Sequence, residues 1–288
     1  MPTPSPAPTL AVGKAVETAI SVVADIAVGI SLAELVARAA LQVRLDRKYL
    51  VAAAEFTRLA ARLEDELEAL DIDGRRSFGY ESHYFDTPSL LTYREHLAGC
   101  SDRFKLRTRS YLDSGETMFD VKLEGPGGGT MKRRASHVFD DRNRITGDAR
   151  RHLAAALREA GRSVPRALAV SLVIAYRRTT FVLRDGSARV TCDRDLVWTH
   201  GRETVTGLSD HVLVEVKSAG ATSIVDRVLE ELCVEPVSIG KYCVGLALLR
   251  RELPSGPWNA LLERYFGRLH GGTSPQPLEV QNDGLRAA

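Results

Sequence analysis

The sequence has few cysteines, and none of them are spaced like metal ligands. The four are Cys100, Cys192, Cys233 and Cys243, and no CxxC pair occurs among them. This spacing excludes a zinc-ribbon type of site, and four thiols in 288 residues do not resemble the disulfide framework of a small secreted protein. The simplest interpretation is a protein of the reducing cytoplasm.

Long apolar runs are also missing. The most apolar stretch, residues 15–40, is interrupted by Glu17, Asp25 and Arg38 among others, so it contains no run of about 18 apolar residues that could span a membrane. It also lacks the basic start of a secretory signal. We interpret it as an amphipathic helix that follows a Pro-rich, disordered tail at residues 1–8.

Neither sign of charge dominates the composition. Lysine and arginine total 39 and the acids total 37, which gives a net charge of +2 at pH 7. A protein that coats nucleic acid needs a strong overall excess of positive charge, so we expect no nucleic-acid partner. The charge is instead patterned along the chain, because cations follow predicted strands and acids concentrate in helices such as residues 62–70. That distribution favours a local anion site.

The strongest pattern is a set of basic strands in the first half of the chain. Lys105, Arg107 and Arg109 occupy every second position, and alternate side chains of a β-strand point to the same face. Residues 119–124 repeat the alternation, and a Gly-rich loop then leads to a further basic run at 132–134. Cations packed together are destabilising unless an anion offsets them, so this surface suits a polyanion.

Hydrophobic periodicity and turn residues predict the other elements. The predicted strands cover residues 43–51, 77–86 and 211–218, with a hairpin at 169–198 that turns at Asp185-Gly186. The predicted helices cover residues 52–70, 87–98, 148–160, 222–233, 241–252 and 258–270. Many of the strands have one apolar and one charged face. This pattern fits either a sheet with one solvated face or a closed barrel with a charged interior.

Eight short segments, taken in order, resemble a known family. They are DRKYLV (46–51), SHYFDT (82–87), FKLRTRSY (104–111), FDVKLEG (119–125), YRRTTF (176–181), ARVTCDRDL (188–196), VLVEVK (212–217) and KYC (241–243). Their order resembles that of the VTC domain, the polyphosphate polymerase module of the vacuolar transporter chaperone complex. That domain belongs to the CYTH-like triphosphate tunnel superfamily. One such motif would be a weak signal, whereas eight in the same order indicate the family.

The resemblance implies an α+β fold, a closed antiparallel β-barrel (the triphosphate tunnel) with flanking helices. The resemblance covers about residues 43–251, and together with the composition of the two ends it divides the chain into three parts. These are a disordered Pro-rich tail with an N-terminal helix at 1–41, a phosphate-tunnel domain at 42–252, and a C-terminal helix with a disordered tail at 253–288. The resemblance further implies transfer of the ATP γ-phosphate to a polyphosphate chain, with Mn²⁺ or Mg²⁺ as cofactor. Such a transfer depends mainly on positioning and charge stabilisation, which arginine and lysine side chains provide.

The resemblance also implies roles for particular residues of this sequence. The phosphate ligands of catalysis would be Lys48, Arg107, Arg109, Lys122, Arg178, Arg189 and Lys241. Tyr176 would be a companion contact to the substrate, and Lys132 or Arg134 would supply another, with a register that the sequence leaves open. Glu215 would be the metal-bridging carboxylate, although an ion pair with Lys217 is the alternative role for it.

Two departures from the family pattern bear on activity. Related triphosphatases often begin with an acidic ExExK strand, but Arg44 stands at the first acidic position here, which favours a polymerase over a hydrolase. In the polymerase pattern a serine precedes the late lysine, whereas Gly240 precedes Lys241 and the nearest serine is Ser238, a further candidate for substrate binding. Three hypotheses stay open: a polyphosphate polymerase, a triphosphate or polyphosphate hydrolase, and a non-catalytic module that binds polyphosphate or a nucleotide.

Overall fold

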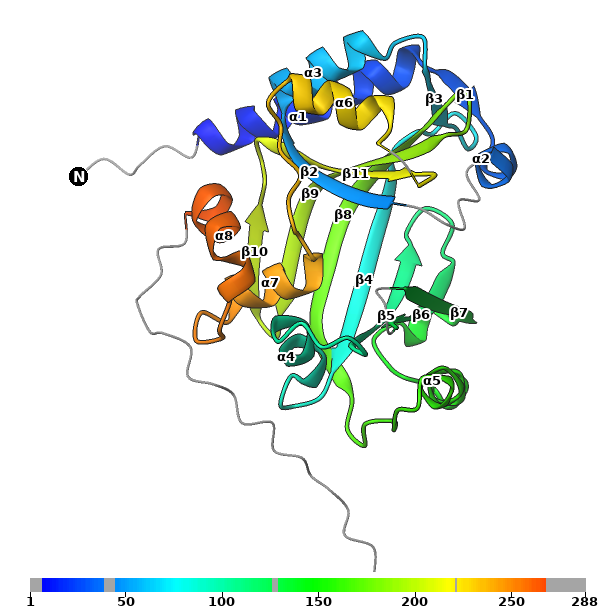
Figure 1. Ribbon diagram of the computed structural model, residues 1–288, viewed down its shortest axis with the longest axis vertical. Coiled ribbons are helices and arrows are strands. Elements are labelled where there is room, and N and C mark those ends of the chain that lie inside the picture. The colour runs from blue at the N-terminus through cyan, green and yellow to red at the C-terminus, as the bar shows by residue number, and fades with distance from the viewer. Residues whose placement is uncertain (1–6, 39–44, 126–128, 221, 268–288) are drawn as a thin grey trace, which may run out of the picture.

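The computed structural model describes residues 7–38, 45–125, 129–220 and 222–267. Within them, eleven strands form one sheet, with the hydrogen-bonded order β2-β11-β9-β8-β4-β5-β6-β7 and with β1, β3 and β10 joined at its sides. The pairs are antiparallel except β1 with β3, which is parallel. The fold is therefore α+β, as predicted, and Figure 1 shows the sheet to be strongly twisted.

The strands are β1 (Val28–Ile30), β2 (Leu45–Ala52), β3 (Leu67–Leu70), β4 (Phe78–Asp86), β5 (Phe104–Tyr111), β6 (Thr117–Glu124), β7 (Thr130–His137), β8 (Ala169–Leu183), β9 (Ala188–His200), β10 (Glu203–Gly207) and β11 (His211–Ser218). The helices are α1 (Ala7–Ile26), α2 (Leu32–Arg38), α3 (Ala53–Arg62), α4 (Leu91–Leu97), α5 (Gly147–Glu159), α6 (Ile224–Glu231), α7 (Lys241–Leu249) and α8 (Asn259–Phe266). Two short 3₁₀ helices cover Phe139–Asp141 and Gly256–Trp258.

Local sequence signals explain several of these boundaries. The β8–β9 hairpin turns at Gly186, whose φ of 70° lies in the left-handed region that glycine tolerates best. Helix α6 begins with a capping box, in which Ser223 and Asp226 each accept from the backbone N–H of the other. Helix α4 begins four residues later than predicted, and the Thr87 hydroxyl accepts from the Leu91 N–H at 3.0 Å.

Two of the predicted helices are interrupted by strands. The helix predicted at 52–70 ends at Arg62, and Leu67–Leu70 forms β3 instead. The helix predicted at 15–40 is split into α1 and α2 by β1, and its last two residues fall outside the described residues. Strands β1 and β3 pair with each other, and β3 also pairs with β8. Pairing at the sheet edge, which is a non-local contact, overrides the helical spacing of the apolar residues here.

The predicted closure of the sheet into a barrel is not confirmed. The strand order ends at β2 and β7, and these two strands do not pair in the described part of the chain. The free edge of β2 has another partner: the Val237 N–H donates to the Lys48 carbonyl at 2.7 Å, and Pro236 forms a β-bridge with Tyr49. The segment between α6 and α7 therefore covers the edge at which a closing strand would pair.

Helices pack on both faces of the sheet. On one face, α1, α3 and α6 bury the apolar side chains of β2, β9 and β11, while α5 buries those of β5 and β6 (Figure 1). On the other face, α4, α7 and α8 pack over β4, β8 and β9 around Tyr93, Trp198 and Tyr242, which are at most 1% exposed. The charged side chains described below lie on this second face.

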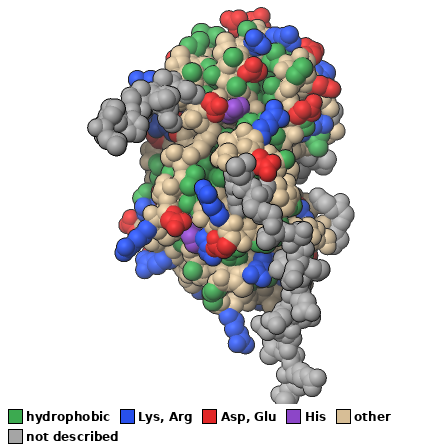
Figure 2. All heavy atoms as spheres, turned by 90° about the vertical axis from the view of Figure 1, so that its left-hand side faces the viewer, with side chains coloured by type: hydrophobic (Ala, Val, Ile, Leu, Met, Phe, Trp, Pro, Cys, Tyr) green, Lys and Arg blue, Asp and Glu red, His purple; other side chains and the backbone are tan. Residues whose placement is uncertain are grey.

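The remaining surface carries mixed charge. Figure 2 shows acidic and basic side chains interspersed over the side of the molecule at the left of Figure 1, in agreement with a net charge near zero. Among the described helices, none combines the length and the apolar character needed to cross a membrane. The N-terminal tail predicted at residues 1–8, the C-terminal tail after the last helix and Arg44 lie largely or wholly outside the described residues.

Candidate functional site

Strand register gathers most of the predicted site residues on one face of the sheet, which we call the charged face. Arg107 lies opposite Asp120 on β6, and Lys48 lies opposite Glu215 on β11. Directly opposed residues share a face, so the register defines the whole set. The cations of the charged face are Lys48, Lys105, Arg107, Arg109, Lys122, Lys132, Arg134, Arg178, Arg189 and Lys217. Its carboxylates, which are fewer, include Asp46, Asp120, Glu124, Asp193 and Glu215.

The register also answers the question that the sequence leaves open for β7. Lys132 lies opposite Lys122, and Arg134 lies opposite Asp120, so both candidates belong to the charged face. Arg133 points to the other face, where it forms an ion pair at 2.5 Å with Glu159 of α5.

The first of three charge clusters is centred on Asp193 of β9. Arg178 of β8 donates from Nε and NH2 to its two oxygens at 2.6 and 2.8 Å, and Lys241, the first residue of α7, also donates to it. Asp193 is completely buried. Burial alone would raise the pKa of this carboxyl, but Arg178 and Lys241 hold it below its usual value. The cluster is thus ionised and carries one more cation than anions.

The second cluster is centred on Glu215 of β11. Lys217 donates to Oε2, and the Lys48 ammonium lies 3.4 Å from Oε1. Burial alone would raise the pKa of Glu215, but the two lysines hold it well below its ordinary range. Burial lowers the pKa of Lys217 to about 8, although Glu215 opposes that shift. The ion pair considered as the alternative for Glu215 is therefore present.

The third cluster is centred on Asp120 of β6. Arg109 donates to Oδ2 at 2.8 Å and Arg107 to the same oxygen at 3.1 Å, while Arg134 donates to Oδ1 at 2.9 Å. Burial alone would raise the pKa of Asp120, but the three guanidinium groups lower it. Three arginines on one carboxylate leave an excess of positive charge, and Arg109 Nε has no hydrogen-bond partner among the described residues.

Tyrosine rings lie between the clusters and support their cations. Tyr176 stacks on Tyr80 with 5.3 Å between ring centroids, and the Lys241 ammonium lies 4.9 Å from the centroid of Tyr176. The Tyr84 hydroxyl accepts from Arg107 at 3.0 Å. Burial alone would raise the pKa of Tyr84, but Arg107 and other nearby cations lower it. Cation–π contacts of this kind restrict the orientation of the basic groups.

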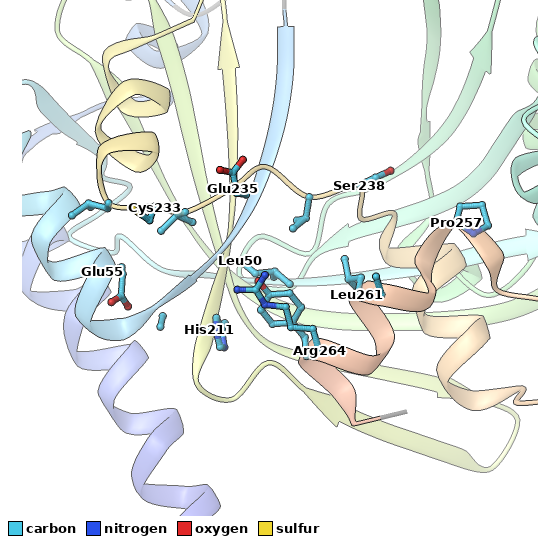
Figure 3. A pocket seen from close by; sticks show the side chains of 15 residues that line it. Leu50, Glu55, His211, Cys233, Glu235, Ser238, Pro257, Leu261 and Arg264 are labelled. Carbon is cyan, nitrogen blue, oxygen red and sulfur yellow. The ribbon is translucent and has the colours of Figure 1, made fainter. Parts of the chain in front are cut away.

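The other predicted residues have different surroundings. Lys122 is 42% exposed and pairs with Glu124, and Arg189 lies opposite Lys217 in the register. Ser238 is exposed and lines a pocket beside the charged face (Figure 3). The prediction that Ser238 contacts phosphate thus gains no support from its position.

Some buried polar atoms of this face have no hydrogen-bond partner within the described protein. They include Arg109 Nε and the hydroxyl of Ser82, which lies directly opposite Arg109 on β4. The hydroxyl of Thr191, opposite Glu215, is a further case. Buried polar groups are nearly always hydrogen-bonded, so these atoms are suited to a polar ligand that enters the face.

A divalent metal fits this face only together with its substrate. The described residues contain no group of three His, Cys, Asp or Glu side chains placed to hold a metal. Glu215 and Asp193 are hard oxygen donors, but each is already engaged by two cations. Mg²⁺ and Mn²⁺ commonly bind through one or two carboxylates and the phosphates of a substrate. The donor set therefore suits an ion that arrives with phosphate.

The sequence-based assignment missed the acids that organise the clusters. Asp193 and Asp120 were not predicted as site residues, nor was Lys217. A signal for them was present, because Asp193 alternates with Arg189 along β9 and Asp120 with Lys122 along β6. An acid that shares a strand face with several cations could have been predicted as a site residue, because buried charges need partners.

A face of partly buried arginines and lysines, with fewer carboxylates among them, is chemically suited to multivalent anions. The family model named VTC domain matches residues 43–250, and the chain belongs to this family, as the resemblance predicted. No curated protein matches the chain.

Several solved structures are similar to this chain. One is a proposed adenylate cyclase from Bacillus halodurans, at 15% identity and a TM-score of 0.47, which covers 69% of this chain and 94% of its own. A second, a proposed adenylyl cyclase from Hippeastrum described as having a dominant triphosphatase activity, has 14% identity, a TM-score of 0.46 and coverages of 71% and 96%. The Pct1 RNA triphosphatase of S. pombe has 11% identity, a TM-score of 0.26 and coverages of 81% and 86%.

Proposed function

We propose that this protein is an ATP-dependent polyphosphate polymerase that transfers the γ-phosphate of ATP to a polyphosphate chain on the charged face. The observation that carries the proposal is the convergence of three cation-rich clusters, around Asp120, Asp193 and Glu215, on one face of one sheet. Membership in the VTC domain family supports it. An excess of partly desolvated cations is costly to the apo protein and is offset by a bound phosphate chain.

In the proposed mechanism the protein positions the reactants and stabilises negative charge. A terminal oxygen of the growing chain attacks the γ-phosphorus, the bond from that phosphorus to the β–γ bridging oxygen breaks, and ADP leaves. The guanidinium groups of Arg107, Arg109 and Arg178 can each hold two phosphate oxygens, and Lys48 and Lys241 add compact charges. Little covalent help is needed, since the transition state is largely metaphosphate-like.

Glu215 is the proposed ligand for Mn²⁺ or Mg²⁺, with phosphate oxygens as the other ligands. Such an ion supplies further neutralisation of charge on the β- and γ-phosphates when it is bound. In the unliganded protein Lys217 and Lys48 occupy the carboxylate of Glu215. Its use as a ligand therefore requires that the two ammonium groups turn toward phosphate.

The proposal also covers the remaining substrate contacts and the extent of the functional unit. Lys122, Lys132, Arg134, Arg189, Tyr176 and Ser238 are proposed to contact the phosphate chain. The unit is proposed to span residues 42–252 and to work in the cytoplasm, where ATP is abundant.

The decisive experiment uses the purified protein with ATP and Mn²⁺, followed by a gel for long polyphosphate and an assay for ADP. A ladder of chains with equal release of ADP is the expected result. Free phosphate without chains would replace the proposal with a hydrolase, and binding without any product would replace it with a binding module. Arg178→Ala should abolish the ladder. The matched control is Arg62→Ala, because Arg62 is an exposed residue of α3 that pairs with Glu231 of α6.

A further inference from the structure

A separate pocket of about 490 Å³ lies between β2, the segment that joins α6 to α7, and α8. Figure 3 shows Leu50, Leu261 and Arg264 at its centre, with Glu235 on the connecting segment and His211 at the side. Its volume is that of an ordinary small-molecule site, and Leu50, Val237 and Leu261 give it apolar walls.

This pocket adjoins the charged face. Leu50 follows Lys48 by two residues on the same face of β2, a step of about 6.6 Å along a strand. The Val237 N–H, in the opposite wall, is hydrogen-bonded to the Lys48 carbonyl. Three residues after Ser238, which also lines the pocket, Lys241 begins α7. The two walls of the pocket therefore continue directly into two of the cations proposed to bind phosphate.

The chemistry of the pocket differs from that of the charged face. Leu261 and the ring of Tyr265, which packs edge-on against His211 with centroids 5.1 Å apart, offer apolar and aromatic surface. Glu55 and Glu235 add two carboxylates and Arg264 adds one guanidinium, so these three side chains sum to one negative charge, which opposes phosphate. The carboxylates can also accept hydrogen bonds from hydroxyl and amino groups. A phosphate chain has no apolar surface to bury here. A nucleoside has flat ring faces, a sugar with hydroxyls and, in adenine, an amino group.

We propose that this pocket binds the nucleoside of the nucleoside triphosphate whose phosphates lie on the charged face. The inference rests on the proposed function, which it deepens by making the nucleotide, and not phosphate alone, the recognised substrate. The apolar walls and the tyrosine ring hold the base, and the carboxylates hold the sugar hydroxyls or an exocyclic amino group. The net negative charge that Glu55 and Glu235 leave after Arg264 is counted directs the phosphates away from the pocket and toward Lys48 and Lys241.

The test compares the binding of ATP and of inorganic triphosphate by calorimetry in a Mg²⁺ buffer. Ala260 is exposed on α8 and lines the pocket, so Ala260→Trp should fill it without disturbing the core. Ala61→Trp, at an exposed position of α3 that does not line the pocket, is the matched control. Tyr265→Ala is a second variant, which removes the aromatic wall.

We expect Ala260→Trp and Tyr265→Ala to weaken ATP about tenfold, the scale of one lost base-stacking contact, and to leave triphosphate binding unchanged. Ala61→Trp should change neither. If the ratio of the two dissociation constants is the same in all four proteins, the pocket does not hold the nucleoside, while triphosphate binding still supports the phosphate site. If neither ligand binds the unaltered protein, the proposed function fails and this inference fails with it.

Discussion

Arg178 holds Asp193 with two parallel hydrogen bonds, from Nε at 2.6 Å and from NH2 at 2.8 Å, at the centre of the charged face. Lys241 shares the same carboxylate from the start of α7. Asp193 therefore ties two strands and a helix together while it leaves the cluster with a net positive charge. Asp193 is completely buried, so the fold depends on its carboxylate to neutralise the two cations. The same carboxylate reduces the positive charge that the cluster offers to a ligand.

Asp193→Asn should lower the free energy of unfolding by about 3 kcal/mol or more, because it leaves two cations in a buried place without their anion. Triphosphate should restore much of that loss, so the thermal shift it produces should be larger than in the unaltered protein. Thermal unfolding with and without ligand measures both effects. Asp102→Asn, at a side chain 60% exposed, is the control and should behave as the unaltered protein. An equal loss in both variants would contradict the role of burial.

The double change Arg107→Ala and Arg109→Ala should sharply reduce the rise in melting temperature that polyphosphate causes. Both side chains are directed at Asp120, and their removal deletes two of the three guanidinium groups of that cluster. The effect should be greater at low salt than at high salt, since salt screens the attraction. Without ligand, the variant should be less stable than the unaltered protein, because Asp120 loses two partners. A full ligand-induced shift in the variant would mean that these arginines are only a solvated face.

Alternation along the strands predicted which side chains share the charged face, because a period of two is a local property of a strand. Lys48, Arg178 and Glu215 all lie where that rule places them. The ion pairs within the face were harder to predict, since they depend on which strands are neighbours. Asp193 reaches Lys241 across 48 positions of the sequence, a contact that no local pattern encodes.

The errors in the predicted fold have the same origin. Leu67 and Leu70 carry a helical spacing of apolar residues, but pairing with β1 and β8 makes them a strand. The barrel was predicted from the family and from alternation. Alternation determines which side chains share a face of a strand, but it does not determine which segment pairs with an edge strand. At β2 that partner is the loop residue Val237, through a hydrogen bond to Lys48.

Glu215→Gln should abolish metal-dependent turnover and leave the protein folded. The amide lacks the charge that a divalent ion requires, and it also removes the anion that Lys48 and Lys217 share. Polymer formation across a Mn²⁺ titration measures the first effect, and circular dichroism checks the fold. Glu231→Gln, at an exposed acid 63% accessible on α6, is the control. Unchanged activity of Glu215→Gln at saturating metal would remove Glu215 from the metal site.

Triphosphate affinity should fall as the pH rises through about 8, because Lys217 loses its proton there. Burial lowers the pKa of this ammonium from its ordinary value of 10.5, so the group is charged below about 8 and neutral above it. Phosphate groups, with a second pKa of about 6, stay ionised over the same range. The charged face thus loses one positive charge while its ligand keeps its own. Calorimetry between pH 7 and 9.5 at constant ionic strength should show a dissociation constant that rises several-fold.

The stability of the unliganded protein should change in the opposite direction over the next pH interval. Between the folded pKa of about 8 and the unfolded value of 10.5, the unfolded chain binds the Lys217 proton and the folded chain does not. The free energy of unfolding therefore rises with pH in this window, since the cost of burying the ammonium is relieved. Lys217→Met, which keeps the length of the side chain, should remove both pH dependences. The triphosphate affinity of the variant should be flat from pH 7 to 9.5. The difference in the free energy of unfolding between the variant and the unaltered protein should shrink toward pH 10.5. If the variant follows the same two curves as the unaltered protein, another group titrates, and Lys217 is charged throughout as a simple partner of Glu215.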